Sequence, residues 1–195
     1  MSKECEKIHK YIRNLERHAF PFNKDKVYKN GVYILFEKDE VGHGGDRIVR
    51  VGSHTGNDNL IKRLEEHFYK ENKDRSIFRK NIGRALLNKK NDTYLDVWDI
   101  DFTKSEVKKK YGELLDKEYQ ENIEQEVSKY IIDKFTFSVI EVIDKKERLS
   151  TEKSIINIVS ACSECNDSNN WLGRFSTIEK IKKSGLWQTQ HIKER

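Results

Sequence analysis

At 195 residues and 23.2 kDa, the chain is long enough for one domain with a substantial core. Hydrophobic residues make up 35% of it, charged residues 36% and aromatic residues 10%, a composition that argues against disorder. No segment approaches the roughly 20 apolar residues that span a bilayer. Because the first residues, Met1 to Glu6, carry charges where a signal peptide would be apolar, we expect a cytoplasmic protein without membrane association.

The formal net charge of +5 is unevenly distributed along the chain. Residues 60–90 hold ten Lys or Arg against four Asp or Glu, a net of +6, whereas residues 91–134 hold seven against twelve, a net of −5. A basic segment beside an acidic one favours one face for a polyanion and another turned away from it. A solvated, lysine-rich helix would give the same pattern.

Three cysteines are too few for a disulfide framework and fit a reducing compartment. Cys162 and Cys165 form a Cys-x-x-Cys pair, which could be half of a zinc site. No second Cys/His pair accompanies it at zinc-ribbon or zinc-finger spacing, so the sequence favours neither zinc nor redox chemistry here.

The first half of the chain predicts a helix, a hairpin and two further helices. Apolar residues at helical spacing indicate a helix over 3–19, limited by Pro21. Two β-rich runs, 32–36 and 47–51, are joined by the turn-rich residues 38–46, which predicts a hairpin with a long loop. Apolar residues then recur at helical spacing in residues 60–68 and again in residues 77–86, which predicts two helices.

The second half of the chain combines strand-like and helix-like patterns of apolar residues. Residues 94–102 alternate bulky with acidic side chains and predict a half-exposed strand, and 107–131 predict one long amphipathic helix, bent near Gly112. A strand over 135–143, a buried helix over 150–159 and a last helix over 178–184 follow. The order of elements predicts an α+β protein.

Short motifs and their order connect this chain to a known family. Gly31-Val32-Tyr33 opens the first strand, Arg50-Val51-Gly52 closes its partner, Arg63 stands on the next helix, and Glu152 begins a later one. This arrangement resembles the GIY-YIG nuclease family, whose core is a small, mostly antiparallel sheet flanked by helices. The resemblance covers residues 31–87 and 135–187. It implies a single domain, 1–195, with an N-terminal helical extension (1–28) and an insertion (94–134).

Longer strings narrow the resemblance. Residues 76–87, residues 170–176 and the ending 184–187 are similar to a prokaryotic subgroup that includes small restriction endonucleases. A domain of this size without an appended zinc finger or helix-turn-helix favours a restriction-type enzyme over a homing or repair enzyme.

The resemblance assigns roles in phosphodiester hydrolysis to four residues. Tyr33 would activate water, since a phenol beside a cation can relay a proton. Arg50 stands where the family usually has its second tyrosine and could hold the scissile phosphate. Arg63 would neutralise charge on the phosphoryl oxygens. His67, four residues after Arg63 on one helix face, would orient Tyr33 or accept its proton. Each could instead be an ordinary packed or exposed side chain.

Glu152 matches the family's metal-binding glutamate and would hold Mg²⁺ or Mn²⁺. It could otherwise be an exposed first-turn glutamate. The family often adds an asparagine after that helix. Asn166, Asn169 and Asn170 compete for this place, and we favour Asn170 beside Trp171.

Four basic side chains are candidate DNA contacts, which would position the duplex without reading its sequence. They are Arg79, Lys80, Arg84 and Arg174. Together these residues predict a Mg²⁺-dependent endonuclease acting on DNA, most simply double-stranded, possibly as a type II restriction enzyme and a homodimer. The alternatives are a catalytically inactive nucleic-acid-binding domain on the same scaffold, or a protein-interaction domain that uses the long helix.

Overall fold

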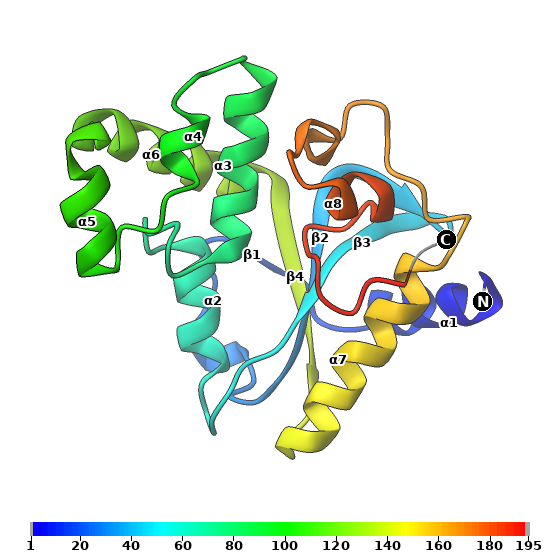
Figure 1. The fold of residues 1–195 in the computed structure, drawn as a ribbon. Helices are drawn as coiled ribbons and strands as arrows, with labels where there is room; N and C mark the ends of the chain where they lie inside the picture. Colours follow the sequence, from blue (N-terminus) through cyan, green and yellow to red (C-terminus); the bar gives the residue numbers. More distant parts are fainter. Residues whose placement is uncertain (1, 194–195) are drawn as a thin grey trace.

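The computed structural model describes residues 2–193 and has a four-stranded antiparallel sheet at its centre (Figure 1). The strand order is β1-β4-β2-β3, and all three neighbouring pairs run antiparallel. The bounds of the strands are β1 His18–Ala19, β2 Gly31–Gly42, β3 Gly45–Gly52 and β4 Phe135–Glu141. The α+β prediction is confirmed.

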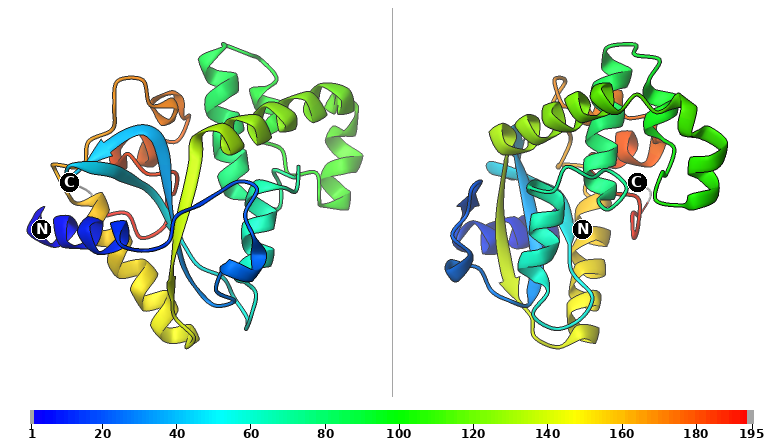
Figure 2. Two further views of the ribbon diagram at one scale, coloured as in Figure 1. Left: turned by 180° about the vertical axis from the view of Figure 1, so that it is seen from behind. Right: turned by 90° about the vertical axis from the view of Figure 1, so that its left-hand side faces the viewer.

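Helices cover both faces of the sheet (Figures 1 and 2). Helices α1 and α7 lie on one face, and α2, α3 and α6 lie on the other. The helices are α1 Ser2–Arg13, α2 Leu60–Phe68, α3 Ile77–Lys89, α4 Leu95–Trp98, α5 Ser105–Tyr111, α6 Lys117–Lys134, α7 Lys145–Ser160 and α8 Glu179–Ser184, with short 3-10 turns η1 Lys24–Lys26, η2 Gly112–Leu114 and η3 Leu172–Phe175.

The continuous apolar run at the start of β2 is explained by this double cover. Side chains alternate across a strand, so Tyr33 and Leu35 enter the core beneath α2 and α3. Val32 and Ile34 enter the second core beneath α1 and α7. A strand buried on both faces needs no polar alternation.

The hairpin is tighter than the sequence indicated, and the predicted long loop is wrong. β2 extends to Gly42 and β3 begins at Gly45, so that only His43 and Gly44 form the turn. Their φ angles are 49° and 74°. Positive φ at both central residues is the type I′ geometry, whose twist matches that of the two strands.

Residues 95–134, here called the helical lobe, contradict two expectations. The predicted strand over 94–102 is wrong because α4 occupies its first half and buries Trp98 against Gly83, where a Cβ atom would lie 2.3 Å from the indole ring. The indole N–H of Trp98 also donates to the carbonyl of Lys80 at 3.0 Å. The predicted single long helix is divided into α5, η2 and α6, because Asp116 caps a new helix at the backbone N–H of Tyr119.

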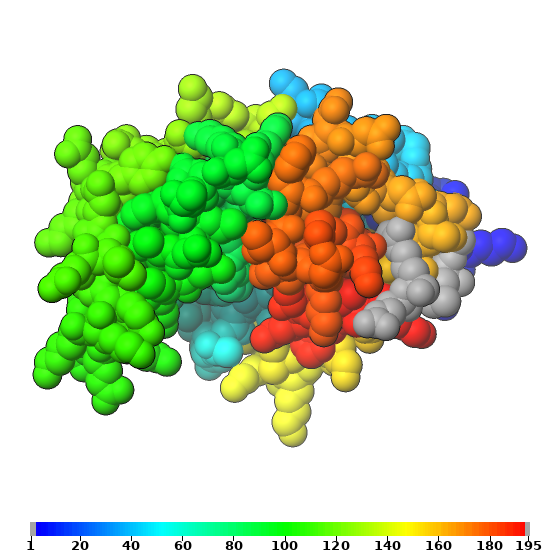
Figure 3. All heavy atoms as spheres, turned by 45° about the horizontal axis from the view of Figure 1, so that its top comes forward, coloured from blue at the N-terminus to red at the C-terminus, as the bar shows by residue number. Residues whose placement is uncertain are grey.

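The two ends of the described chain pack on the same sheet. The predicted helix over 3–19 ends early, at Arg13, and His18–Ala19 pairs with β4 instead. Near the other end, the indole N–H groups of Trp171 and Trp187 both donate to buried Glu37, at 2.9 and 2.7 Å. Figure 3 shows this C-terminal part, orange to red, beside the green helical lobe.

Within residues 2–193, no helix is long and apolar enough to cross a membrane.

Candidate active site

Tyr33 lies on β2 with its ring over the backbone of β3. Its strand partner is Gly52, and a Cβ atom at Gly52 would lie 2.3 Å from the phenol oxygen. Only glycine leaves room for the ring, which explains why a glycine closes the second tripeptide. Tyr33 is 1% exposed, and its hydroxyl reaches the wall of a cavity.

A hydrogen-bonded chain holds the Tyr33 hydroxyl. The phenol oxygen is 2.8 Å from Nε2 of His67 on α2, and Nδ1 of His67 is 2.7 Å from the hydroxyl oxygen of Ser76. Ser76 is also the N-cap of α3, where it accepts the backbone N–H of Arg79 at 3.3 Å. The position of His67 is therefore fixed by the start of the next helix.

Four of the predicted catalytic side chains line one cavity of about 580 Å³. Tyr33 and Arg50 enter it from the sheet, Arg63 from α2, and Glu152 from α7 on the opposite side of the sheet edge. The cavity thus lies where β3, the edge strand, leaves a passage between the two helical layers. His67 stays behind Tyr33, fully buried, and reaches the cavity only through the phenol.

Arg50 occupies a buried position beside the tyrosine and is 6% exposed. Its guanidinium donates to the carbonyl of Trp187 and lies over the Phe78 ring, 5.2 Å from the ring centroid. Among the described residues, no group accepts a hydrogen bond from its Nε atom. Two elements distant in sequence therefore hold this cation at the cavity wall.

Arg63 and Glu152 line the cavity and are held less tightly than Arg50. The Arg63 guanidinium is 3.1 Å from the Glu66 carboxylate, one turn along α2, and its side chain is 28% exposed. The Glu152 carboxylate accepts a hydrogen bond from the hydroxyl of Ser53, directly after β3. Both side chains keep polar atoms available to a ligand in the cavity.

Burial lowers the pKa of His67 well below its ordinary value of 6.5, and the guanidinium groups of Arg50, Arg63 and Arg79 lower it further. The imidazole is therefore uncharged at neutral pH. A neutral ring has one N–H and one lone pair, so it can donate to one neighbour and accept from the other.

This shift predicts a pH dependence of stability. Because the pKa of His67 is lower in the folded than in the unfolded chain, the unfolded chain binds more protons below pH 6.5. The contribution of His67 to the free energy of unfolding is present above that pH and is lost as the pH falls towards the pKa of His67 in the folded chain. Urea titrations at about pH 7.5 and about pH 5.5 measure this loss. Between these two pH values, His67→Gln should lose less free energy of unfolding than the wild type loses. Burial also lowers the pKa of His18 and His54, so part of the dependence should remain in the variant.

The asparagines after α7 lie elsewhere. Asn166, Asn169 and Asn170 are exposed, and none lines the cavity. Their loop contacts the far end of β2, where Ser168 donates to Glu40. Asn170 is therefore not brought together with Tyr33 and Glu152.

The four candidate DNA contacts are engaged in ion pairs. Arg79 is fully buried and binds Glu124 of α6, with an N–O distance of 2.8 Å. Lys80 and Arg84 pair with Asp74 and Asp99, and Arg174 pairs with Asp167. Arg79 and Arg84 of the basic segment thus pair with Glu124 and Asp99 of the acidic one, and none of the four candidate side chains lines the cavity. Lys62 does line it, beside Arg63.

Sequence reasoning missed several polar residues at the site. Ser53 and Ser76 position Glu152 and His67, and Asn81 and Gln188 line the cavity. The Nδ2 atom of Asn81 is buried and has no hydrogen-bond partner within residues 2–193. Ser76 carried an N-cap signal before the apolar helix, but its contact with His67 depends on how α2 and α3 pack.

Comparison with known protein families gives a match over almost the whole chain. The family model described as the GIY-YIG domain matches residues 4–195. Neither a curated protein nor a solved structure matches the chain. The antiparallel sheet, the flanking helices and a match over nearly the whole chain agree, and this domain implies nuclease activity in general. The chain belongs to the GIY-YIG domain family.

Proposed function

We propose that the protein is a Mg²⁺-dependent endonuclease that hydrolyses phosphodiester bonds of double-stranded DNA, leaving a 5′ phosphate and a 3′ hydroxyl. The observation that carries the proposal is the meeting of Tyr33, Arg50, Arg63 and Glu152 in one cavity. Glu152 follows Tyr33 by 119 residues in the sequence, so the fold brings these two side chains together.

Tyr33 activates water together with His67. The phenol oxygen takes a proton from the attacking water while its own proton passes over 2.8 Å to Nε2 of His67. The water oxygen forms a bond to phosphorus, the bond from phosphorus to the 3′ oxygen breaks, and the 3′ oxygen takes a proton from solvent to become the hydroxyl. Because the pKa of His67 is lowered, its imidazole is free to accept at neutral pH and releases the proton readily afterwards.

Arg63 and Arg50 stabilise the phosphoryl group. A planar guanidinium presents several donors to phosphate oxygens and stays charged at all working pH values. Arg63 is the less restrained of the two, since its ion pair with Glu66 is partly exposed. Arg50 is fixed by the Trp187 carbonyl and contributes a stationary positive charge beside Tyr33.

Glu152 fits a divalent cation by the chemistry of its surroundings. A carboxylate beside a serine hydroxyl, in a cavity with room for several waters, is the oxygen donor set that Mg²⁺ prefers. When bound there, the cation stabilises negative charge on the leaving 3′ oxygen. Mn²⁺ accepts the same donors and should substitute for Mg²⁺.

A catalytically inactive DNA-binding domain is the second candidate, because Arg50 replaces the family's second tyrosine. It predicts salt-sensitive binding without cleavage. The protein-interaction alternative required an exposed apolar face on the predicted long helix. In α6 that face is buried through Ile123, Val127 and Ile131, so this argument no longer applies.

We further propose restriction as the biological role, carried out in the cytoplasm. Its support is the similarity of residues 76–87 and 170–187 to small restriction endonucleases. The residues that the structure describes bring one set of these four side chains together, so a double-strand cut requires either a homodimer or two successive nicks.

Incubation with supercoiled plasmid of mixed sequence tests the proposal. We expect cleavage when Mg²⁺ or Mn²⁺ is added and none when divalent cations are omitted. Discrete fragments would support restriction, and a smear would indicate an unspecific nuclease. Plasmid that stays intact, together with a salt-sensitive gel shift, would favour the inactive binding domain.

A further inference from the structure

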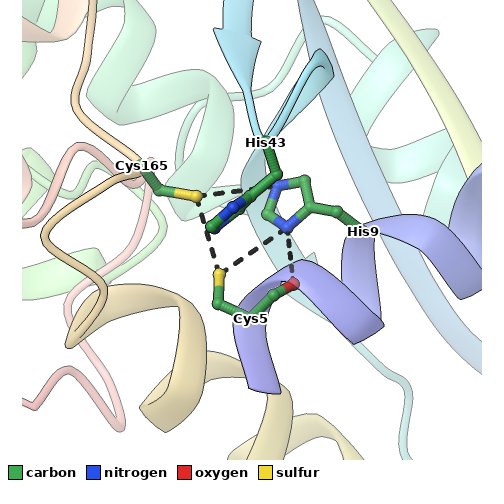
Figure 4. A group of neighbouring side chains, drawn as sticks. All are labelled: Cys5, His9, His43 and Cys165. Atoms are coloured by element: carbon green, nitrogen blue, oxygen red, sulfur yellow. Dashed lines mark hydrogen bonds between the residues drawn. The ribbon is translucent and has the colours of Figure 1, made fainter. Parts of the chain in front are cut away.

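A second group of polar side chains lies outside the candidate active site, where the N-terminal helix meets the hairpin turn. It consists of Cys5 and His9 of α1, His43 of the turn between β2 and β3, and Cys165 of the loop after α7 (Figure 4). One ligand-type atom from each residue lies within 4.8 Å of all the others. Cys5, His9 and Cys165 are at most 2% exposed, and the His43 side chain is 4% exposed.

The distances within this group fit one tetrahedral ion. Two thiolates bound to one Zn²⁺ at ~2.3 Å lie about 3.8 Å apart, and the Cys5 and Cys165 sulfurs are 3.6 Å apart. Cys165 Sγ is 3.8 Å from Nε2 of His9. The Cys5 and Cys165 sulfurs do not form a disulfide bond with each other, because 3.6 Å is far longer than the ~2.05 Å of such a bond.

Both histidines present Nδ1 to a neighbouring oxygen. Nδ1 of His9 is 3.0 Å from the carbonyl oxygen of Cys5, and Nδ1 of His43 is 3.6 Å from the Glu164 carboxylate. Nε2 of His9 is 3.8 Å from the Cys165 sulfur and 3.4 Å from the backbone nitrogen of Ile48, and Nε2 of His43 is 3.3 Å from the sulfur of Cys162. Metal-bound histidines are commonly oriented in this way, by a carbonyl or carboxylate on the second nitrogen.

The hairpin turn brings His43 to this group. Its φ is 49°, in the left-handed region that a type I′ turn requires and that histidine adopts more often than most residues other than glycine. The turn places its imidazole beside that of His9, with the ring centroids 5.0 Å apart.

We propose that Cys5, His9, His43 and Cys165 form a structural Zn²⁺ site. Two sulfur and two imidazole donors in a tetrahedral arrangement suit Zn²⁺, whereas Mg²⁺ and Ca²⁺ require oxygen donors. Because four protein ligands complete the shell, no position is open for a substrate. The site serves the fold and is independent of the nuclease chemistry proposed above.

The ion would join three segments that are distant in sequence. Cys5 and Cys165 are 160 residues apart, and the hairpin turn lies between them. The link fixes α1 to the hairpin and fixes the loop that leads from α7 to Trp171. The Cys165 sulfur also packs 3.3 Å from the position of a Cβ atom at Gly42, so loop and hairpin already touch.

Metal analysis of the full-length protein, purified without chelators, tests the site. We expect about one zinc per chain by mass spectrometry. A zinc-selective chelator should lower the Tm, and added Zn²⁺ should restore it. Co²⁺ added to the chelated protein should give the intense visible absorption of a tetrahedral site and a thiolate charge-transfer band. Because these readouts need no DNA, they stay independent of cleavage.

The three cysteines supply matched variants. Cys5→Ser and Cys165→Ser should reduce bound zinc about tenfold or more in competition with a chelator. Cys162→Ser is the control. This buried thiol belongs to the same loop and lies 3.3 Å from Nε2 of His43, but it is outside the four-atom group. It should keep its zinc and its Co²⁺ spectrum.

Three results would overturn the proposal. Wild-type protein that holds no zinc and gives no Co²⁺ spectrum would exclude the site. A disulfide between Cys5 and Cys165, seen by mass spectrometry in freshly purified protein, would replace it with a redox link. Zinc loss in Cys162→Ser as complete as in Cys165→Ser, with full zinc in His43→Asn, would refute the ligand set.

Discussion

Replacing Glu152 by glutamine should slow plasmid cleavage about 10³-fold, since a divalent cation supplies several kcal/mol of charge stabilisation in phosphoryl transfer. The amide keeps the shape of the side chain and its hydrogen bond from Ser53 but loses the charge that holds the cation. DNA binding should stay intact or become tighter, because a negative charge leaves the cavity. Cleavage rates at saturating protein and gel-shift affinities measure the two effects separately.

Glu147→Gln is the matched control for this experiment. Glu147 lies on the same helix, α7, is exposed and does not line the cavity. It undergoes the same change of charge, so cleavage at the wild-type rate is expected. Undiminished cleavage by Glu152→Gln would falsify the proposed metal ligand, and equal losses in both variants would indicate a general effect of charge.

Replacing Tyr33 by phenylalanine should lower the cleavage rate about 10²–10⁴-fold, the usual contribution of a positioned proton-transfer group. The ring stays packed over Gly52, so the fold should persist. His67 Nε2 loses its partner at 2.8 Å, which should cost about 1 kcal/mol of stability. Single-turnover cleavage and urea denaturation of the same preparation distinguish lost chemistry from lost structure.

Tyr28→Phe provides the comparison. Tyr28 is 49% exposed and lies outside the cavity, so removal of its hydroxyl should leave cleavage and stability unchanged. If Tyr33→Phe cleaved as fast as Tyr28→Phe, the phenol would have no part in proton transfer. Arg50 and Arg63 would then have to be tested as the groups that act on water.

Local patterns in the sequence were sufficient for most of the sheet. The apolar run that begins β2 and the helical spacing of α2 and α3 depend on neighbouring residues, and both were predicted. The alternation of residues 94–102 was misleading. Trp98 enters the core through the space above Gly83, and this contact decides the local conformation in favour of a helix.

The candidate site shows the same limit of prediction from local sequence patterns. The motif order predicted Tyr33, Arg63 and Glu152 as site residues, and all three line one cavity. The ion pair of Arg79 with Glu124 could not be foreseen, because 45 residues separate the two charges and only the packing of α6 on α3 joins them. A count of basic residues reports the charge of a segment but not which charges are already paired.

The sequence rules for metal sites do not find the four donors of the proposed zinc site, for a related reason. Cys5 and His9 stand four apart on a helix and present both donors on one side. Their counterpart, Cys165, lies at the other end of the chain, beyond any spacing that a zinc motif would define. Only the hairpin turn and the path of the loop after α7 show that these donors converge.

The anchoring of Arg50 has a consequence for the order of folding. Its carbonyl partner, Trp187, is 137 residues away, and the backbone N–H of Trp187 in turn donates to Val49 at 2.8 Å. Contacts of such long range form late, because a large loop must close first. During synthesis on the ribosome, the sheet and its first helices can assemble before residue 187 emerges. Arg50 acquires its anchor only then, so the nascent chain carries an incomplete cavity until residue 187 has emerged.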